Sequence, residues 1–181
     1  MLVNHMVYFV RHGQSETNLK GVFAGQKENS LLTDAGKEQA QETALSIKSE
    51  IPDVERIISS PLLRALETAQ IIAKEIGFSG EIEIDDRIIE YDMGSLTGTE
   101  FHKISSKTLV QAENAEDPDK FYMRVIEAVK QFSNSSENIL VVSHAGVGRI
   151  LEIAKLRMAP ELFYDLPAYV NASVTKIDWI K

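Results

Sequence analysis

Two apolar runs of the sequence are each followed closely by a histidine. Arg11 and His12 come after the run Met6–Val10, and His144 comes after the uninterrupted run Ile139–Val142. An imidazole can act as a nucleophile, and a neighbouring guanidinium can hold a negatively charged substrate. These residue types therefore predict chemistry on an anion, and phosphate is the anion that fits them best.

Arg64 provides a second, independent signal. We expect a helix with Ser60 as its N-cap and Pro61 at its first helical position, which places Arg64 in the first turn. A positive charge in the first turn interacts unfavourably with the helix dipole. An anion bound beside Arg64 would make the electrostatic energy of this arrangement favourable. The alternative interpretation of Arg64 is a solvated surface side chain.

Apolar strands alternate with amphipathic helices along the chain. We expect strands at 6–10, 56–59, 81–84, 139–142 and within 170–180, and helices that begin at Thr33, after Ser60, at Asp117-Pro118 and after His144. This order predicts an α/β fold, a three-layer α/β/α sandwich with a mostly parallel sheet. Ligands of such sheets bind beyond the C-terminal ends of the strands, so Arg11, His12, Arg64 and His144 should meet at one edge.

Composition excludes several classes of function. A length of 181 residues fits a single domain, and we expect one domain over 1–181 with a small lid at about 91–117. The net charge of −8 disfavours nucleic-acid and membrane partners, and the absence of cysteine excludes disulfides and thiolate chemistry. With neither a signal-like N-terminus nor a membrane-length apolar stretch, we expect a cytoplasmic protein.

No metal or other cofactor is expected either. The sequence contains no HxH or DxH pair and no phosphate-binding loop of the Gly-Lys-Ser/Thr type. The acidic residues Asp85, Asp86, Glu90 and Asp92 are the alternative, because carboxylates can hold Mg²⁺. Solvated carboxylates are the commoner case, so we expect no metal ligands among them.

Four segments, taken together, resemble the histidine phosphatase superfamily, whose members share the phosphoglycerate mutase-like fold. In order along the chain they are Arg11-His12-Gly13-Gln14-Ser15-Glu16-Thr17-Asn18, Ser59-Ser60-Pro61-Leu62-Leu63-Arg64-Ala65, Glu90-Tyr91-Asp92-Met93-Gly94 and Val141-Val142-Ser143-His144-Ala145-Gly146. Together they span most of the chain and stand in the order typical of the family.

The resemblance implies a role for each matching residue. His12 would be the phosphorylated nucleophile and Glu90 the proton donor, and Arg11, Arg64 and His144 would form the phosphate pocket. Asn18 matches a residue that contacts the phosphoryl group. Gln14 and Ser15, in the same segment, are further substrate-binding candidates.

Three functions remain open at this point. The first is a metal-independent phosphomonoesterase that acts on a phosphorylated small molecule or a phosphoprotein. The second is a phosphotransferase of the phosphoglycerate mutase type, and the third is a regulatory module that only binds phosphorylated ligands. A mutase must shield its phosphoenzyme from water. The short segment 91–117 and the few residues after the last expected strand therefore favour hydrolysis. The oligomeric state stays open.

Aromatic residues near the expected lid are candidates for the wall that faces the rest of the substrate. They are Phe23, Tyr91, Phe101 and Tyr122. His102 lies in the same part of the chain and is a weaker candidate for substrate contact, whereas we expect His5 to be structural or exposed.

Overall fold

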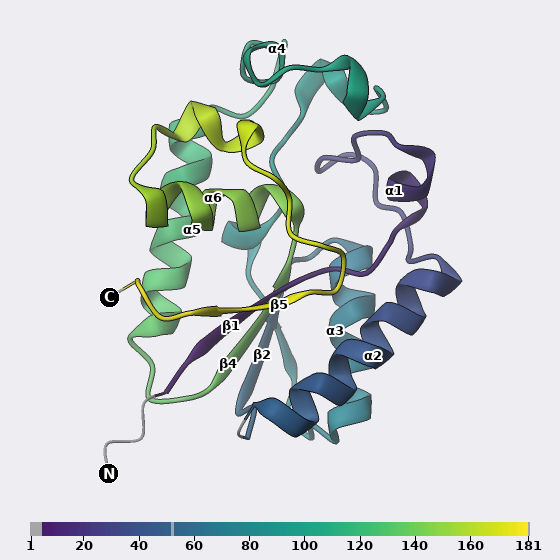
Figure 1. Cartoon of the computed structure of the whole chain (residues 1–181), viewed down its shortest axis with the longest axis vertical. Coiled ribbons are helices and arrows are strands. Elements are labelled where there is room, and N and C mark those ends of the chain that lie inside the picture. The colour runs from purple at the N-terminus through teal and green to yellow at the C-terminus, as the bar shows by residue number, and fades with distance from the viewer. Residues whose placement is uncertain (1–4, 52, 181) are drawn as a thin grey trace.

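The computed structural model describes residues 5–51 and 53–180, which contain one five-stranded sheet (Figure 1). The strands are β1 (Val7–Arg11), β2 (Arg56–Ser59), β3 (Ile82–Ile84), β4 (Ile139–Ser143) and β5 (Val174–Ile177). Their order across the sheet is β3-β2-β4-β1-β5, and only β5 runs antiparallel to its neighbour. The predicted mostly parallel sheet is therefore confirmed.

Helices cover both faces of this sheet. The α-helices are α1 (Glu16–Lys20), α2 (Asp34–Glu50), α3 (Leu63–Ile76), α4 (Ser106–Val110), α5 (Pro118–Ser133) and α6 (Ala145–Leu156). In Figure 1, α2 and α3 lie on one side of the strands and α5 and α6 lie on the other. The three predicted layers are thus present.

Strand β4 shows why the sheet needs cover on both faces. Its alternate residues Ile139 and Val141 pack into the apolar cluster that contains α5 and α6. Leu140 and Val142 pack instead with the apolar side chains of α2 and α3. Because side chains alternate between the faces of a strand, an uninterrupted apolar run fits a strand buried on both sides.

Most of the predicted helix ends are confirmed. The side chain of Thr33 accepts a hydrogen bond from the Gly36 N–H (3.0 Å) at the start of α2. Asp117 accepts one from the Lys120 N–H (3.1 Å) at the start of α5. Gly77 ends α3 with a φ of 75°, in the left-handed region that glycine adopts most easily.

The predicted start of α3 is wrong. Leu62, not Ser60, is the N-cap, and its side chain makes no capping hydrogen bond. Asn29, from a distant loop, accepts a hydrogen bond from the Leu63 N–H (2.7 Å) and caps the helix in its place. The hydroxyl oxygen of Ser60 lies 2.6 Å from Nε2 of His144 and accepts only a long hydrogen bond from the Leu62 N–H (3.4 Å), so its main partner is a tertiary one.

Short helices dominate two segments beyond the C-terminal edge of the sheet, residues 91–117 and residues 160–165. Segment 91–117 contains 3₁₀ helices at Gly94–Leu96 and Phe101–Lys103 and the single short helix α4. Further 3₁₀ helices occur at Asp86–Ile88 and Pro160–Asp165. Figure 1 shows α4 at the top of the molecule, beyond the ends of the parallel strands. Across the described residues, no helix combines the length and the apolar character needed to span a bilayer.

Candidate active site

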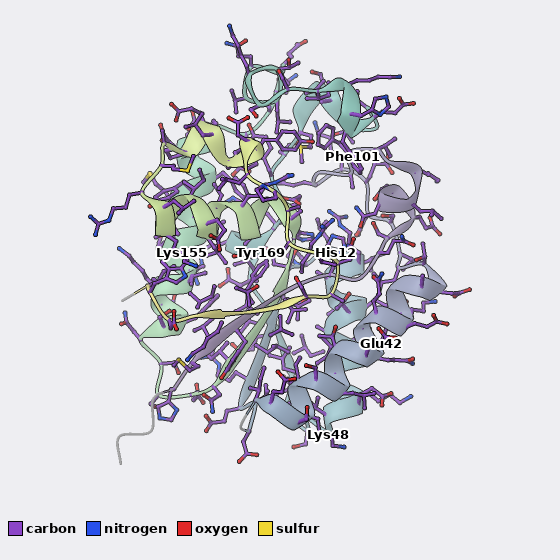
Figure 2. The ribbon with its side chains drawn as sticks, in the orientation of Figure 1. His12, Glu42, Lys48, Phe101, Lys155 and Tyr169 are labelled. Atoms are coloured by element: carbon purple, nitrogen blue, oxygen red, sulfur yellow. The ribbon has the colours of Figure 1, made fainter. Side chains whose placement is uncertain are left out.

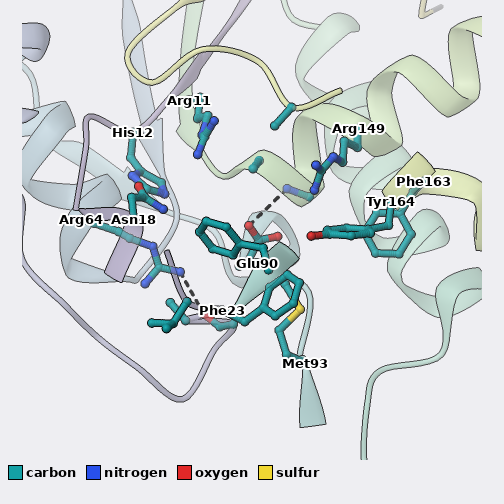
Figure 3. A pocket seen from close by; sticks show the side chains of 17 residues that line it. Arg11, His12, Asn18, Phe23, Arg64, Glu90, Met93, Arg149, Phe163 and Tyr164 are labelled. Carbon is teal, nitrogen blue, oxygen red and sulfur yellow. Dashed lines mark hydrogen bonds between the residues drawn. The ribbon is translucent and has the colours of Figure 1, made fainter. Parts of the chain in front are cut away.

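A cavity of about 280 Å³ opens at the C-terminal edge of the sheet (Figure 3). Five of the eight residues predicted to be catalytic or substrate-binding line it, namely Arg11, His12, Asn18, Arg64 and Glu90. They come from the end of β1, from α1, from α3 and from the loop after the 3₁₀ helix at Asp86–Ile88. The parallel strands thus bring together side chains that lie far apart in the sequence.

His12 lies at the floor of the cavity with its ring held in one orientation. The ring nitrogen Nδ1 lies 2.7 Å from the Gly13 carbonyl oxygen. A carbonyl can only accept, so Nδ1 carries the proton and the neutral ring has its lone pair on Nε2. Within the described residues Nε2 has no hydrogen-bond partner, which leaves it free to face a ligand.

The surroundings of His12 keep this ring neutral. Only 3% of the residue is exposed, and burial is the main reason why the pKa of His12 falls well below its ordinary value. The positive charges of Arg64 and Arg11 lower the pKa further, whereas the hydrogen bond to Gly13 opposes them. A neutral imidazole is the nucleophilic form, so the site favours the reactive state near neutral pH.

His144 packs beside His12 beneath the cavity. The two rings meet edge to face with their centroids 5.2 Å apart, and the Nε2 of His144 lies 2.6 Å from the hydroxyl oxygen of Ser60. Burial, followed by the charge of Arg64, lowers the pKa of His144 well below its ordinary value. Its Nδ1 is buried and has no hydrogen-bond partner within the described part of the chain. A buried nitrogen of this kind is available to a ligand or to a small local rearrangement.

Arg64 is a buried cation that main-chain carbonyls hold in place. Only 2% of the residue is exposed, so the solvated alternative is wrong. Its two terminal nitrogens donate to the carbonyl oxygens of Glu28 (3.0 Å) and Gly25 (2.9 Å). Burial lowers its pKa, and the nearby carboxylate of Glu90 opposes that shift. The two hydrogen bonds fix the direction of the guanidinium and leave other N–H groups for an anion.

A main-chain carbonyl in the C-terminal part of the chain holds Arg11 in a similar way. One terminal nitrogen donates to the Tyr169 carbonyl oxygen, while Nε is buried and has no partner among the described residues. The pKa of Arg11 is lowered to about 10, mainly by burial, while the charge of Glu90 opposes the shift. An anion between Arg11 and Arg64 would offset the cost of burying two positive charges.

Glu90 is held in the cavity by main-chain donors. One of its carboxyl oxygens accepts from the N–H of Tyr91 (2.8 Å) and the other from the N–H of Gly146 (3.2 Å). A Cβ atom at Gly146 would lie 2.1 Å from Glu90 Oε1, so any larger residue would displace the carboxyl group. The glycine that follows His144 is therefore required by the close approach of Glu90.

Arg124, from α5, supports the segment that carries Glu90. Its terminal nitrogens donate to the carbonyl oxygens of Arg87 (2.7 Å), Ile89 (2.8 Å) and Glu90 (3.0 Å). It also forms an ion pair with Glu116, with Nε 2.7 Å from Oε1. The backbone on both sides of Glu90 is thus fastened to a long helix of the scaffold.

The remaining substrate-binding candidates occupy different places. Asn18 lines the cavity, and its side-chain oxygen accepts from the Ser15 N–H (3.2 Å) and from Nδ2 of Asn171 (3.2 Å). Gln14 and Ser15 do not line the cavity. Gln14 accepts a hydrogen bond from the Thr33 hydroxyl (2.9 Å), and Ser15 is the buried N-cap of α1. Their substrate-binding role stays a prediction.

Two of the four aromatic wall candidates line the cavity. Phe23 and Phe101 lie against each other there, with ring centroids 5.5 Å apart. Tyr91 is fully buried in the apolar core, and Tyr122 also packs against that core, so neither lines the cavity. Figure 2 shows Phe101 near the top of the molecule and His12 closer to the strands.

The two other histidines lie away from this cavity. The side chain of His102 is 75% exposed and stands 3.4 Å from a carboxyl oxygen of Glu100. His5 is exposed and faces Glu55. Neither residue has a place among those that line the cavity.

Sequence reasoning missed the opposite wall of the cavity. Arg149 of α6 and the aromatic pair Phe163 and Tyr164 of the 3₁₀ helix at Pro160–Asp165 form that wall (Figure 3). Arg149 has one available signal, because it follows Ala145, which also lines the cavity, by four residues on a helix. The aromatic pair has none, since nothing near it in sequence indicates a site.

The acidic cluster does not assemble into a metal site. Asp85 pairs with Arg87 (2.7 Å), and Asp92 lies 3.6 Å from Lys27. Within residues 5–51 and 53–180, no group of three or more acidic or histidine side chains is arranged to hold a metal ion. Three guanidinium groups and one imidazole, that of His12, are among the described residues that line the cavity, whereas His144 does not line it.

Comparison with known proteins identifies the class to which this fold and cavity belong. The sequence profile of the histidine phosphatase superfamily (branch 1) matches residues 7–181, and the chain belongs to that superfamily. The chain is 34% identical over 179 residues to a 2,3-bisphosphoglycerate-dependent phosphoglycerate mutase of Thermoplasma acidophilum, a match that covers 93% of this chain and 84% of that protein.

Phosphatases are also among the similar proteins. Putative phosphoserine phosphatase 2 of Hydrogenobacter thermophilus is 33% identical over 155 residues, which cover 77% of this chain and 73% of that protein. The structure of a mycobacterial glucosyl-3-phosphoglycerate phosphatase in complex with VO3 superposes with a TM-score of 0.79 at 22% identity, covering 95% of this chain and 92% of that one. The phosphoglycerate mutase-like fold is therefore confirmed, and the relatives include both phosphatases and mutases.

Proposed function

We propose that this protein is a phosphomonoesterase that needs no metal ion and that works through a phosphohistidine on His12. The observation that carries the proposal is the orientation of His12, whose Nδ1 is paired with the Gly13 carbonyl at 2.7 Å so that Nε2 is the nucleophilic atom. The flanking cations Arg11 and Arg64 support it, because they would neutralise the oxygens of a phosphoryl group during transfer.

The first step transfers the phosphoryl group to the protein. Nε2 of His12 forms a bond to phosphorus while the bond from phosphorus to the ester oxygen breaks. The carboxyl proton of Glu90 passes to that oxygen, so that a neutral alcohol leaves and Glu90 becomes a carboxylate. The hydrogen bond from Nδ1 to Gly13 stabilises the positive charge that the ring acquires.

The second step releases inorganic phosphate. A water oxygen forms a bond to phosphorus, and the electron pair of the nitrogen–phosphorus bond returns to Nε2 of His12. The Glu90 carboxylate accepts the proton of that water, which restores the starting state of both residues. His144 and Asn18 are proposed to hold the phosphoryl oxygens during both steps, as the superfamily resemblance implies.

A chromogenic phosphate ester tests this proposal directly. We expect the wild-type protein to release phosphate in the presence of EDTA, and His12→Ala to lose about 10⁴-fold or more of that activity. His102→Ala is the matched control, because it removes an exposed imidazole outside the cavity. Full activity of His12→Ala, or an activity that EDTA abolishes, would contradict the proposal. Ester binding without turnover by the wild type would indicate a binding module instead.

A mutase activity is the second candidate. It is favoured by one observation, the 34% identity to a phosphoglycerate mutase. Incubation with 3-phosphoglycerate, with catalytic 2,3-bisphosphoglycerate to phosphorylate the histidine, separates the two activities, since a phosphatase releases inorganic phosphate and glycerate whereas a mutase yields 2-phosphoglycerate. The short segment 91–117, which contributes Met93 and Phe101 to the cavity, supports access of water and hence hydrolysis.

The expected partner is a phosphorylated small molecule or a phosphoprotein. A net charge of −8 supports the exclusion of nucleic acids and membrane surfaces from the proposed partners. A cytoplasmic location belongs to the same proposal, because phosphorylated metabolites and phosphoproteins are available there.

A further inference from the structure

The loop that follows His12 lies directly against the start of α2. A Cβ atom at Gly13 would lie 2.3 Å from the Gly36 carbonyl oxygen, and one at Gly36 would lie 2.0 Å from the carbonyl oxygen of Gln14. The N–H of Thr33, the N-cap of α2, donates to that same Gln14 oxygen (2.9 Å). The backbone beside the nucleophile is therefore in close contact with a long helix of the scaffold.

Gln39, in the second turn of α2, adds a side-chain contact to this backbone. Its Oε1 accepts a hydrogen bond from the Gln14 N–H (2.9 Å). A backbone N–H can only donate, so the side-chain atom that faces it must be the oxygen of the amide. Within the described part of the chain, Gln39 is not among the residues that line the cavity. It therefore acts on the site through the backbone and not by touching a substrate.

The Gln14 N–H and the Gly13 carbonyl belong to one planar peptide unit. The two groups of a trans peptide point in opposite directions, so a contact that fixes the N–H also fixes the carbonyl. That carbonyl oxygen lies 2.7 Å from Nδ1 of His12. Hydrogen bonds in a chain also polarise one another, which makes the carbonyl a stronger acceptor. Two hydrogen bonds and one peptide unit thus connect Gln39 to the nucleophile.

The neighbouring contacts do not fix this carbonyl. Thr68 accepts a hydrogen bond from the Gly13 N–H (3.1 Å), and Thr33 holds the Gln14 carbonyl. Both contacts belong to the peptide units on either side. A flip of the peptide between Gly13 and Gln14 would leave them intact, because it turns only the Gly13 carbonyl and the Gln14 N–H. The contact with Gln39 is the one that such a flip would break.

We propose that Gln39 is a positioning residue for phosphoryl transfer, which keeps the nucleophilic lone pair on Nε2 of His12 by holding the Gly13 carbonyl toward Nδ1. After a flip, the Gln14 N–H would face Nδ1 in place of the carbonyl. Nδ1 would then have to accept, and the proton of the neutral ring would move to Nε2, the atom that attacks phosphorus. The inference rests on the proposed phosphohistidine mechanism and adds the side chain that sets the tautomer of its nucleophile.

The substitution Gln39→Met removes the acceptor and keeps the length of the side chain. We expect it to slow the formation of phosphohistidine about 3- to 10-fold, as for loss of one neutral hydrogen bond, in a rapid-quench experiment with p-nitrophenyl phosphate. Gln39→Glu keeps an oxygen at the same place and should recover most of the rate. Gln41→Met is the matched control, because Gln41 lies on the same helix and is exposed, and it should leave the rate unchanged.

Nitrogen NMR of the histidine rings reads the tautomer directly. The signals of His12 are those that are absent from His12→Ala. We expect the wild type to carry the ring proton on Nδ1, and Gln39→Met to carry it on Nε2 in a measurable fraction of molecules. Gln39→Glu and Gln41→Met should match the wild type. Slower phosphorylation of Gln39→Met with an unchanged tautomer would overturn the inference, because the loss would then arise from the fold.

The NMR measurement also separates this inference from the proposed function, because it requires no turnover. A change of tautomer in Gln39→Met, in a protein whose wild type forms no phosphohistidine, would leave the role of Gln39 standing and refute the proposed mechanism. Phosphorylation of His12 at the wild-type rate in Gln39→Met, with the proton still on Nδ1, would support the mechanism and overturn the role of Gln39.

Discussion

The two ends of the cavity are built in different ways. At the phosphate end, His12 pairs with the Gly13 carbonyl, Arg11 with that of Tyr169, and Arg64 with those of Gly25 and Glu28. At the alcohol end, the walls are the side chains of Phe23, Phe101, Phe163 and Tyr164, which contact one another mainly through their rings. The cationic side chains at both ends are anchored by main-chain carbonyls, Arg149 by that of Leu166, but only the alcohol end has a wall of packed aromatic rings.

From this difference we infer that the phosphate end determines the rate of phosphoryl transfer and the alcohol end determines the choice of substrate. Phosphoryl transfer needs cations and a nucleophile that are oriented before the substrate arrives, because reorganisation during the reaction would raise the barrier. The alcohol end needs only a shape and a charge that suit the leaving group. We therefore expect changes at the phosphate end to lower turnover strongly and changes at the alcohol end to alter the choice of substrate.

Glu90 stands between the two ends, and after His12 itself its loss should have the largest effect. We expect Glu90→Gln to lower kcat about 10²- to 10⁴-fold for alkyl phosphates, because the departing alkoxide needs a proton. The loss should be much smaller for p-nitrophenyl phosphate, whose leaving group is stable as an anion. Steady-state kinetics on both esters provides the measurement. Equal losses on the two would show that Glu90 only maintains the structure.

Arg64 tests whether the cations at the phosphate end must be fixed in direction. Lysine keeps the charge but cannot donate to the two loop carbonyls and to an anion in the same geometry. We expect Arg64→Lys to lower kcat/KM for any phosphomonoester by about 10²- to 10³-fold. Arg56→Lys, a change in a partly exposed ion pair with Glu83 and Glu137, is the control. Full activity of Arg64→Lys would contradict a fixed pocket.

The buried histidines should make stability depend on pH. Because the pKa values of His12 and His144 are lowered in the folded state, the unfolded chain binds more protons once the pH falls below about 6.5. Stability should then decrease by about 1.4 kcal/mol per pH unit for each histidine. Urea unfolding between pH 6 and pH 5 measures the slope, and His12→Ala should reduce it by about half of the total. A slope that His12→Ala leaves unchanged would contradict a depressed pKa at His12.

Phe101 provides the smallest expected effect. It lines the alcohol end and is partly exposed, so Phe101→Ala should enlarge the mouth of the cavity with little loss of core packing. We expect KM for small esters to rise a few-fold and kcat to stay nearly constant, as for loss of uniform binding. A fall of kcat comparable to that of Arg64→Lys would show that the two ends are not separable.

The phosphate end could be predicted from the sequence because each of its parts has a local signal. The apolar run before Arg11 and His12 predicts a buried strand, and the chemistry stands where that run ends. Thr33 and Asp117 mark helix starts by residue types that cap locally. The parallel topology then brings these strand ends to one edge without further information.

The alcohol end could be predicted only in part. Phe23 and Phe101 are candidates by sequence, whereas the wall formed by Arg149, Phe163 and Tyr164 depends on tertiary contacts. One contact beside the phosphate end is tertiary as well, because the hydroxyl of Ser60, which has the residue type of an N-cap, pairs with His144 while Asn29 caps α3 from another loop. Tyr91 resembles a wall residue by position and is buried in the core instead. Arg149 reaches the cavity only because Leu166 and Tyr164 hold its guanidinium there, and nothing near Arg149 in sequence specifies that packing.

The most direct test of the account is to trap the phosphorylated protein. Wild-type protein mixed with a phosphate ester, stopped in alkali within one turnover and digested, should yield one phosphohistidine by mass spectrometry, on the peptide that contains His12. The signal should be absent from His12→Ala and should appear no later than the release of inorganic phosphate. Phosphate release without a phosphorylated His12, or a phosphoryl group on His144 alone, would contradict the proposed mechanism.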